Sequence, residues 1–251
     1  MEQESDRNPT FMSADFKSIT RQFMEQQNDI PISDSRRYSE YLVEFMTQSS
    51  RYAVGMVDMV NSSKISAQIG PIKSARYYQI FLNSMSKILF RHGGIVIKNI
   101  GDCLFYYFPD SDGSDQQGLG NCIECSLEMI QSQKYISQQL ICEGLPTIDF
   151  RVSADHGTVL LMKTNNSQGF DMIGPPVNMC SKINHLATKN QFVIGGDLFH
   201  MVKEFKIYQF KEINDFSLGF KLSYPIYSVS HKWYHYVLKY ATSNNNLWKI
   251  L

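Results

Sequence analysis

The order of apolar patterns along this 251-residue chain predicts an α+β fold built on one mainly antiparallel sheet. Between residues 51 and 230 the patterns run strand, helix, strand, strand, helix, strand. Glycines and polar turns separate the stretches, as Gly93-Gly94 does after the first helix. This order is that of a split βαβ, or ferredoxin-like, domain, in which we expect the helices to cover one face of the sheet.

The elements are justified in turn by apolar spacing and by their ends. Period-2 or continuous apolar runs predict strands at residues 51–59, 95–98, 103–108, 148–155, 158–163, 191–194, 206–212 and 224–230. Apolar residues at helical spacing predict helices at residues 74–92, 118–140 and 175–187, and a short helix from Asp197. The pair Pro175-Pro176 suits the first turn of a helix, and the turn glycine Gly101 closes the hairpin.

The two ends of the chain differ from this domain. Residues 1–32 are polar and predict a mobile leader. Ser33 or Asp34 can cap a connecting helix over residues 33–50, which could join two protomers or pack on its own domain. Residues 231–251 form an aromatic C-terminal tail, and tails of this kind more often pack on their own domain than recruit a partner.

Composition excludes some classes of function. The 24 basic and 24 acidic residues are scattered, so we expect no nucleic-acid partner. No apolar run approaches the roughly 20 residues of a membrane span, and the N-terminus lacks a signal peptide, which predicts a soluble, cytoplasmic protein. Five cysteines favour reduced thiols. Cys122 and Cys125 could suggest a redox or zinc motif, but they have no second pair, and we expect buried neighbours in a helix.

Two aspartates follow strands that can lie side by side. Asp58 ends the first strand, and Asp102 follows the turn of the hairpin, so the hairpin would bring both carboxylates to the same ions. Asn61 and Ser62 favour a helix start whose free amides could hold phosphate. Either aspartate alone could be an ordinary turn residue, but together they predict a metal site.

Polar residues on two later segments could complete such a site. Lys98 ends a strand, where a lysine is commonly a solvated edge residue, and Asp171 precedes the helix at Pro175. At 100° per residue, Asn178, Lys182 and His185 share one stripe of that helix. The stripe could equally be the wet face of an amphipathic helix.

The stretch from Arg51 to about Tyr227 resembles the class III adenylyl/guanylyl cyclase catalytic domain. The matching segments are Val57-Asp58-Met59-Val60, residues 94–102, Phe150-Arg151-Val152 with His156-Gly157, and Asp171-x-x-Gly174-x-x-Val177-Asn178 with Lys182. The resemblance implies the same ferredoxin-like palm. It also implies conversion of ATP to cyclic AMP and pyrophosphate by attack of the ribose 3′-hydroxyl on the α-phosphate.

Roles carry over by position. The resemblance implies that Asp58, Asp102 and the Met59 carbonyl hold two Mg²⁺ or Mn²⁺ ions. It implies that Lys98 and Asp171 select adenine over guanine. Catalytic roles fall to residues that bind the ribose, the terminal phosphates and the transition state, which are Asn178, Arg151 and Lys182. Because metal-binding and base-binding residues of one site come from different protomers in this family, the chain is expected to form a homodimer with two interfacial sites.

Two departures from the family pattern leave alternatives open. Lys182 replaces the usual arginine, which keeps the charge but loses the planar fork. Asn61-Ser62-Ser63 replaces the usual Gly-Phe-Thr of the phosphate cradle. The alternative is therefore a weak or inactive cyclase-like ATP-binding sensor or regulatory subunit. A third hypothesis is another palm-type phosphoryl transferase.

Overall fold

The computed structural model describes residues 43–111, 116–164, 170–213 and 224–232. The expected leader at residues 1–32 lies outside these ranges. So do residues 33–42 of the expected connecting helix and residues 233–251 of the expected tail.

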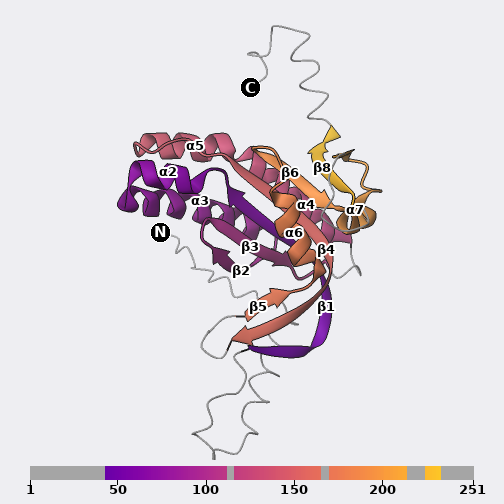
Figure 1. Ribbon diagram of the computed structural model, residues 1–251. Helices are drawn as coiled ribbons and strands as arrows, with labels where there is room; N and C mark the ends of the chain where they lie inside the picture. The colour runs from indigo at the N-terminus through magenta and orange to yellow at the C-terminus, as the bar shows by residue number, and fades with distance from the viewer. Residues whose placement is uncertain (1–42, 112–115, 165–169, 214–223, 233–251) are drawn as a thin grey trace, which may run out of the picture. The chain divides into compact units, whose positions relative to one another are not determined.

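One sheet contains the eight strands found in the described ranges. The strands are β1 (Val43–Met59), β2 (Ile95–Ile100), β3 (Cys103–Phe108), β4 (Phe150–Thr164), β5 (Phe170–Ile173), β6 (Gln191–Gly195), β7 (Tyr208–Glu212) and β8 (Ile226–His231). Their order is β2-β3-β1-β4-β6-β8-β7, and β5 pairs with β4 (Figure 1). The first four strands therefore have the arrangement expected of a split βαβ sheet, with β1 and β4 at the centre.

The helices lie on both faces of the sheet. They are α2 (Ser62–Ile69), α3 (Pro71–Arg91), α4 (Gln116–Gln131), α5 (Gln133–Cys142), α6 (Pro175–Asn184) and α7 (Gly196–Val202). The main buried cluster contains residues of α3, α4, α5 and α7 with Val57 and Val152. Helix α6 packs on the other face, where the Ser153 hydroxyl donates to the Cys180 carbonyl (Figure 1).

The expectation that the helices cover one face is therefore wrong for α6. Strand β5 folds back on β4 in antiparallel register before α6 begins. Strands β4 and β6 are parallel, and a direct strand, helix, strand connection between them would be right-handed. Here the hairpin of β4 and β5 comes before α6, so that rule does not decide on which face α6 lies. No strand was predicted at residues 170–173, where β5 lies, and this change of face was therefore not expected.

The connecting helix predicted for residues 33–50 is also wrong where the structure describes it. Residues 43–50 extend β1. They pair with β4 from Val43↔Thr164 to Ser50↔Val159, with a register shift between Phe45 and Ser49. The apolar spacing that favoured a helix is overridden by ladder hydrogen bonds to a strand more than 100 positions away. Strand β4 is likewise one element, where two were predicted, because Gly157 continues the ladder opposite Tyr52.

Two local features position the site. The β2–β3 register shifts between Val96 and Lys98, which leaves Ile97 as an extra residue. Helix α2 starts after Asn61, which has a left-handed backbone at φ 60° and ψ 27°. Asparagine tolerates this conformation better than most residues other than glycine.

Cys122 and Cys125 are buried in α4, as predicted.

Among the described residues, no helix has the length and apolar character that crossing a membrane requires.

Candidate active site

The β1–β3 pairing brings Asp58 and Asp102 together. Asp58 lies directly opposite Cys103, and Asp102 is the residue before Cys103 in the hairpin turn. The intervening Cys103 thiol is influenced by both carboxylates: burial raises its pKa to about 12, and the charges of Asp58 and Asp102 add to the effect. The predicted meeting of the two aspartates follows from this register.

The electrostatic surroundings of Asp58 combine repulsion and attraction. Burial is the largest cause that raises the pKa of the Asp58 carboxyl above its ordinary value, and the charge of Asp102 raises it further. His185 and Arg151 act in the opposite direction. Two carboxylates in a partly desolvated place favour a bound cation, because a cation relieves their mutual repulsion.

Arg151 lies beside Asp58 on the neighbouring strand. The two residues are direct partners in the β1–β4 ladder, so their side chains share a face of the sheet. The Arg151 Nε is buried and has no hydrogen-bond partner within the described ranges. Buried polar atoms normally have a partner, so this donor is consistent with a guanidinium that meets an anionic ligand.

Lys98 and Asp171 form an ion pair. The Lys98 ammonium donates to Asp171 Oδ2, while Asp171 Oδ1 accepts from the Met172 amide at 2.8 Å. The Lys98 side chain is 42% exposed and that of Asp171 is 23% exposed. A pair this exposed adds little to stability. Because both side chains are partly exposed, their polar atoms are accessible to a ligand. The structure therefore joins two residues that stand 73 positions apart.

The turn before α2 has a left-handed backbone of the kind that glycine most readily adopts, although the residue there is Asn61. Asn61 is left-handed, and its carbonyl accepts the Ile65 amide at 3.0 Å. Its side chain does not cap the helix, so it leaves the first amides of α2 open to another acceptor. Met59 is 3% exposed and packs in the core, so only its backbone can face the site.

Helix α6 presents the predicted polar stripe. Asn178, Lys182 and His185 are exposed, while Cys180 and Ile183 are buried against the sheet. Asn178 and Lys182 are four residues apart and so lie on one side of the helix.

Sequence reasoning missed the part played by two residues at the end of α6, the last residue Asn184 and the C-cap His185. His185 lies on the expected stripe, but its influence on Asp58 was not foreseen. Asn184 is 3% exposed, and its amide donates to Ser153 Oγ at 3.1 Å and to the Arg151 carbonyl at 3.5 Å. A polar residue among apolar neighbours on the buried side of α6 was the available signal for Asn184.

The residues present fit a magnesium-type site. Within the described ranges, no group of three or more His, Cys, Asp or Glu side chains is arranged to hold a metal. Magnesium and manganese in nucleotide enzymes use one or two carboxylates, and waters and substrate phosphates complete their coordination. Asp58 and Asp102 match that donor set better than the closed ligand cage of a structural zinc site.

The family model described as "Adenylate and Guanylate cyclase catalytic domain" matches residues 46–237. An adenylate cyclase from Anabaena cylindrica is 25% identical over 138 residues, which are 54% of this chain and 27% of that protein. The match thus spans about a quarter of that relative's length.

Solved structures agree on the fold. The adenylyl cyclase CyaB from P. aeruginosa has a TM-score of 0.67 at 19% identity, covering 74% of this chain and 96% of that chain. The guanylyl cyclase Cya2 has a TM-score of 0.67 at 18% identity, covering 73% and 93%. The adenylyl and the guanylyl cyclase match equally well. These structures therefore establish the fold but not which purine base the substrate carries. The chain belongs to the family of adenylate and guanylate cyclase catalytic domains.

Proposed function

We propose that the protein is an adenylate cyclase that converts ATP to cyclic AMP and pyrophosphate. The observation that carries the proposal is the convergence of Asp58 and Asp102 beside Arg151. These groups combine a place for divalent cations with a cation for phosphate, as phosphoryl transfer requires. Five free cysteines support a reducing, cytoplasmic setting.

The Lys98–Asp171 pair supports ATP over GTP. An ammonium donates and a carboxylate accepts, which matches the adenine ring N1 acceptor and the exocyclic amine donor. Guanine presents the reverse polarity at those atoms. It would place a donor against the Lys98 ammonium and an acceptor against the Asp171 carboxylate. Discrimination of this kind is strong because mismatched polar groups stay unpaired.

Each remaining residue has a part in the proposed reaction. Divalent cations held by Asp58, Asp102 and the Met59 carbonyl would supply Lewis acidity and lower the pKa of the ribose hydroxyl. Arg151 would stabilise the terminal phosphates, and the first amides of α2 after Asn61 and Ser62 would hold phosphate oxygens. Asn178 would orient the ribose, and Lys182 would stabilise the charged transition state.

The bonds balance without an added co-reactant. The ribose 3′-oxygen forms a bond to the α-phosphorus, the bond from the α-phosphorus to the bridging oxygen breaks, and pyrophosphate leaves. The hydroxyl proton passes to solvent, and no side chain is required as the base. Positioning and electrostatics supply the rate enhancement.

We further propose a homodimer with two interfacial sites. Asn178 and Lys182 project from the exposed side of α6, where a partner's substrate could reach them. One chain carries both the carboxylate pair and the base-binding pair, so two copies can form two equivalent sites. An isologous interface of this kind has twofold symmetry.

Product analysis tests the function. Purified protein is incubated with ATP or GTP and Mg²⁺ or Mn²⁺, and the products are identified by mass. We expect cyclic AMP from ATP, its loss in Asp58→Ala, and weak use of ATP in Lys98→Glu. Lys189→Glu is the matched control, because Lys189 forms another exposed lysine–aspartate pair, with Asp149 at 2.8 Å. Undetectable cyclic AMP with both metals and at high protein concentration would refute the proposal.

Lys182 favours a second candidate, an ATP-binding sensor or regulatory subunit without turnover. A flexible point charge replaces the fork that would steady the transition state. Calorimetry that shows ATP binding to protein that makes no product would select this candidate.

A further inference from the structure

A cavity of about 960 Å³ lies where two neighbouring strands separate. Strands β6 and β8 pair only from Val193↔Ser228 to Gly195↔Ile226. The start of β6 and the end of β8 therefore diverge, and α4 and α5 contribute to the lining of the space between them. Its volume falls in the range of small-molecule sites. None of the candidate active-site residues lines it.

The cavity has an apolar part. Leu127 and Ile130 of α4, Phe192 of β6 and Val229 of β8 all line it. Leu127, Phe192 and Val229 are at most 7% exposed and belong to the main core cluster, so this surface is rigid. An apolar or aromatic group placed here would lose contact with water, which favours binding.

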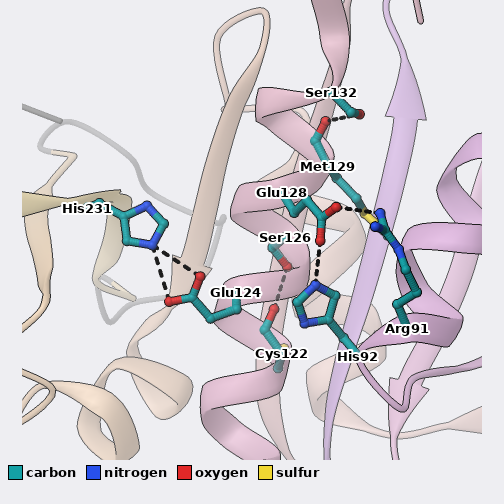
Figure 2. Close-up of polar contacts among 9 residues, drawn as sticks. All are labelled: Arg91, His92, Cys122, Glu124, Ser126, Glu128, Met129, Ser132 and His231. Atoms are coloured by element: carbon teal, nitrogen blue, oxygen red, sulfur yellow. Dashed lines mark hydrogen bonds and ion pairs between the residues drawn. The ribbon is translucent and has the colours of Figure 1, made fainter. Parts of the chain in front are cut away.

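Several polar residues of the lining already have partners. Figure 2 shows Glu124 of α4 beside His231 at the end of β8, with His231 Nε2 3.1 Å from Glu124 Oε2. The Tyr208 hydroxyl donates to the same carboxylate at 2.7 Å. Gln133 donates to the Ile148 carbonyl at 2.6 Å. These contacts fix the walls, so the cavity is formed before any ligand arrives.

Two lysines of the lining have no such partner in the part of the chain that the structure describes. Lys134 of α5 and Lys211 of β7 are exposed, and neither forms an ion pair with a carboxylate of the described residues. No aspartate or glutamate is among the described residues that line the cavity. Its unmatched charge is therefore positive and stands next to an apolar floor.

We propose that this cavity binds an amphipathic organic anion, a small molecule with an apolar or aromatic body and one acidic group. The body would pack on Leu127 and Val229, and the acid would meet Lys134 and Lys211. The proposal goes beyond the cyclase function and does not depend on it, because no residue is shared between the two sites.

Fluorescence titration of the full chain tests the proposal with a matched pair of dyes. Anilinonaphthalene sulfonate has an aromatic body and an acid, whereas phenylnaphthylamine has the same rings without the acid. We expect saturable binding of the sulfonate, weakened about tenfold by Lys134→Met or Lys211→Met, which corresponds to the loss of one charge-assisted contact. The uncharged dye should bind more weakly and not respond to either change.

Lys73→Met is the control variant, because Lys73 is an exposed lysine of α3 outside the cavity. It should leave both dyes unaffected. Equal weakening by Lys73→Met, equal affinity for the two dyes, displacement of the sulfonate by ATP, or absence of saturation would each overturn the proposal. Asp58→Ala should remove cyclase activity and keep dye binding, so the failure of one proposal is distinguishable from the failure of the other.

Discussion

Two carboxylates on the same face of the sheet, Asp58 of β1 and Asp155 of β4, have opposite surroundings. Burial raises the pKa of both, to about 7 for Asp155. Asp155 accepts three hydrogen bonds, from the Tyr224 hydroxyl at 2.8 Å and from the amides of His156 and Leu198 at 2.9 and 3.2 Å. Asp58 instead stands beside a second carboxylate.

The difference separates a structural acid from a candidate catalytic one. Asp155 holds the start of α7 and Tyr224, two residues before β8, in place, and the packing around its carboxylate is tight. A Cβ atom at Gly195 would lie 2.5 Å from the Asp155 Cγ, so only glycine leaves room for the carboxylate. Within the described ranges, no comparable hydrogen-bond donors to Asp58 are seen, so its charge is left for a ligand. Desolvation alone therefore does not identify a catalytic carboxylate. Its hydrogen-bond and charge partners show whether it has a structural or a catalytic role.

The largest expected effect comes from removing the Asp58 charge. Asp58→Asn should lower cyclic AMP formation on the order of 10³-fold, because the variant loses a ligand for the divalent cation. Stability should not fall, since the substitution also removes repulsion from Asp102. Thermal unfolding should show that Mn²⁺ stabilises the original protein and no longer stabilises the variant. Activity within tenfold of the original protein would place Asp58 outside the metal site.

The reverse result is expected for Asp155. Asp155→Ala leaves the Tyr224 hydroxyl and the Leu198 amide without an acceptor, so the free energy of unfolding should fall by about 3 kcal/mol. Denaturant titration measures this change. Activity per folded molecule should stay within a few-fold of the original. A large loss of activity in fully folded Asp155→Ala would end the distinction between the two acids.

A smaller effect concerns pH. The folded-state pKa of Asp155 is raised, so the folded protein binds a proton more tightly than the unfolded chain, and stability is highest below the unfolded pKa and falls as pH rises through about 7. Between pH 6 and 8 the original protein should lose about 1–2 kcal/mol relative to Asp155→Asn. Unfolding curves at each pH measure the difference. If the free energy of unfolding changed equally with pH in the two proteins, the pH dependence could not be assigned to Asp155.

The smallest expected effect concerns Lys182. Lys182→Arg should raise the turnover number several-fold, because a planar fork holds the transition-state charge in a fixed geometry. Stability should not change, as Lys182 is exposed. Lys182→Met is the control and should lower turnover. Equal rates for lysine, arginine and methionine would show that this position takes no part in the reaction.

Local patterns were sufficient to predict much of the backbone geometry around the candidate site. The turn glycine Gly101 has φ 63°, so the hairpin and the position of Asp102 follow from a residue that readily adopts that conformation. The stripe of α6 follows from helical spacing, because its apolar residues face the sheet. The proximity of Asp58 to Asp102 needed only the pairing of a hairpin with a neighbouring strand.

What could not be predicted depends on distant pairing. Residues 43–50 form a strand only because residues 158–164 are there to pair with them. Strand β5 is four residues long and has a weak pattern of its own. The roles of Asn184 and Asp155 depend on the elements that pack over them, and no local pattern shows which these are.

The extra residue in β2 determines the side to which Lys98 is directed. Val96 opposes Tyr106 and Lys98 opposes Phe105, so Ile97 is passed over. In a regular ladder Ile97 would oppose Phe105, and Lys98 would turn toward Leu104 and the buried cluster, where a charge is costly. The contact proposed between Lys98 and the purine base thus depends on this one-residue bulge in β2 as much as on which side chain stands at position 98.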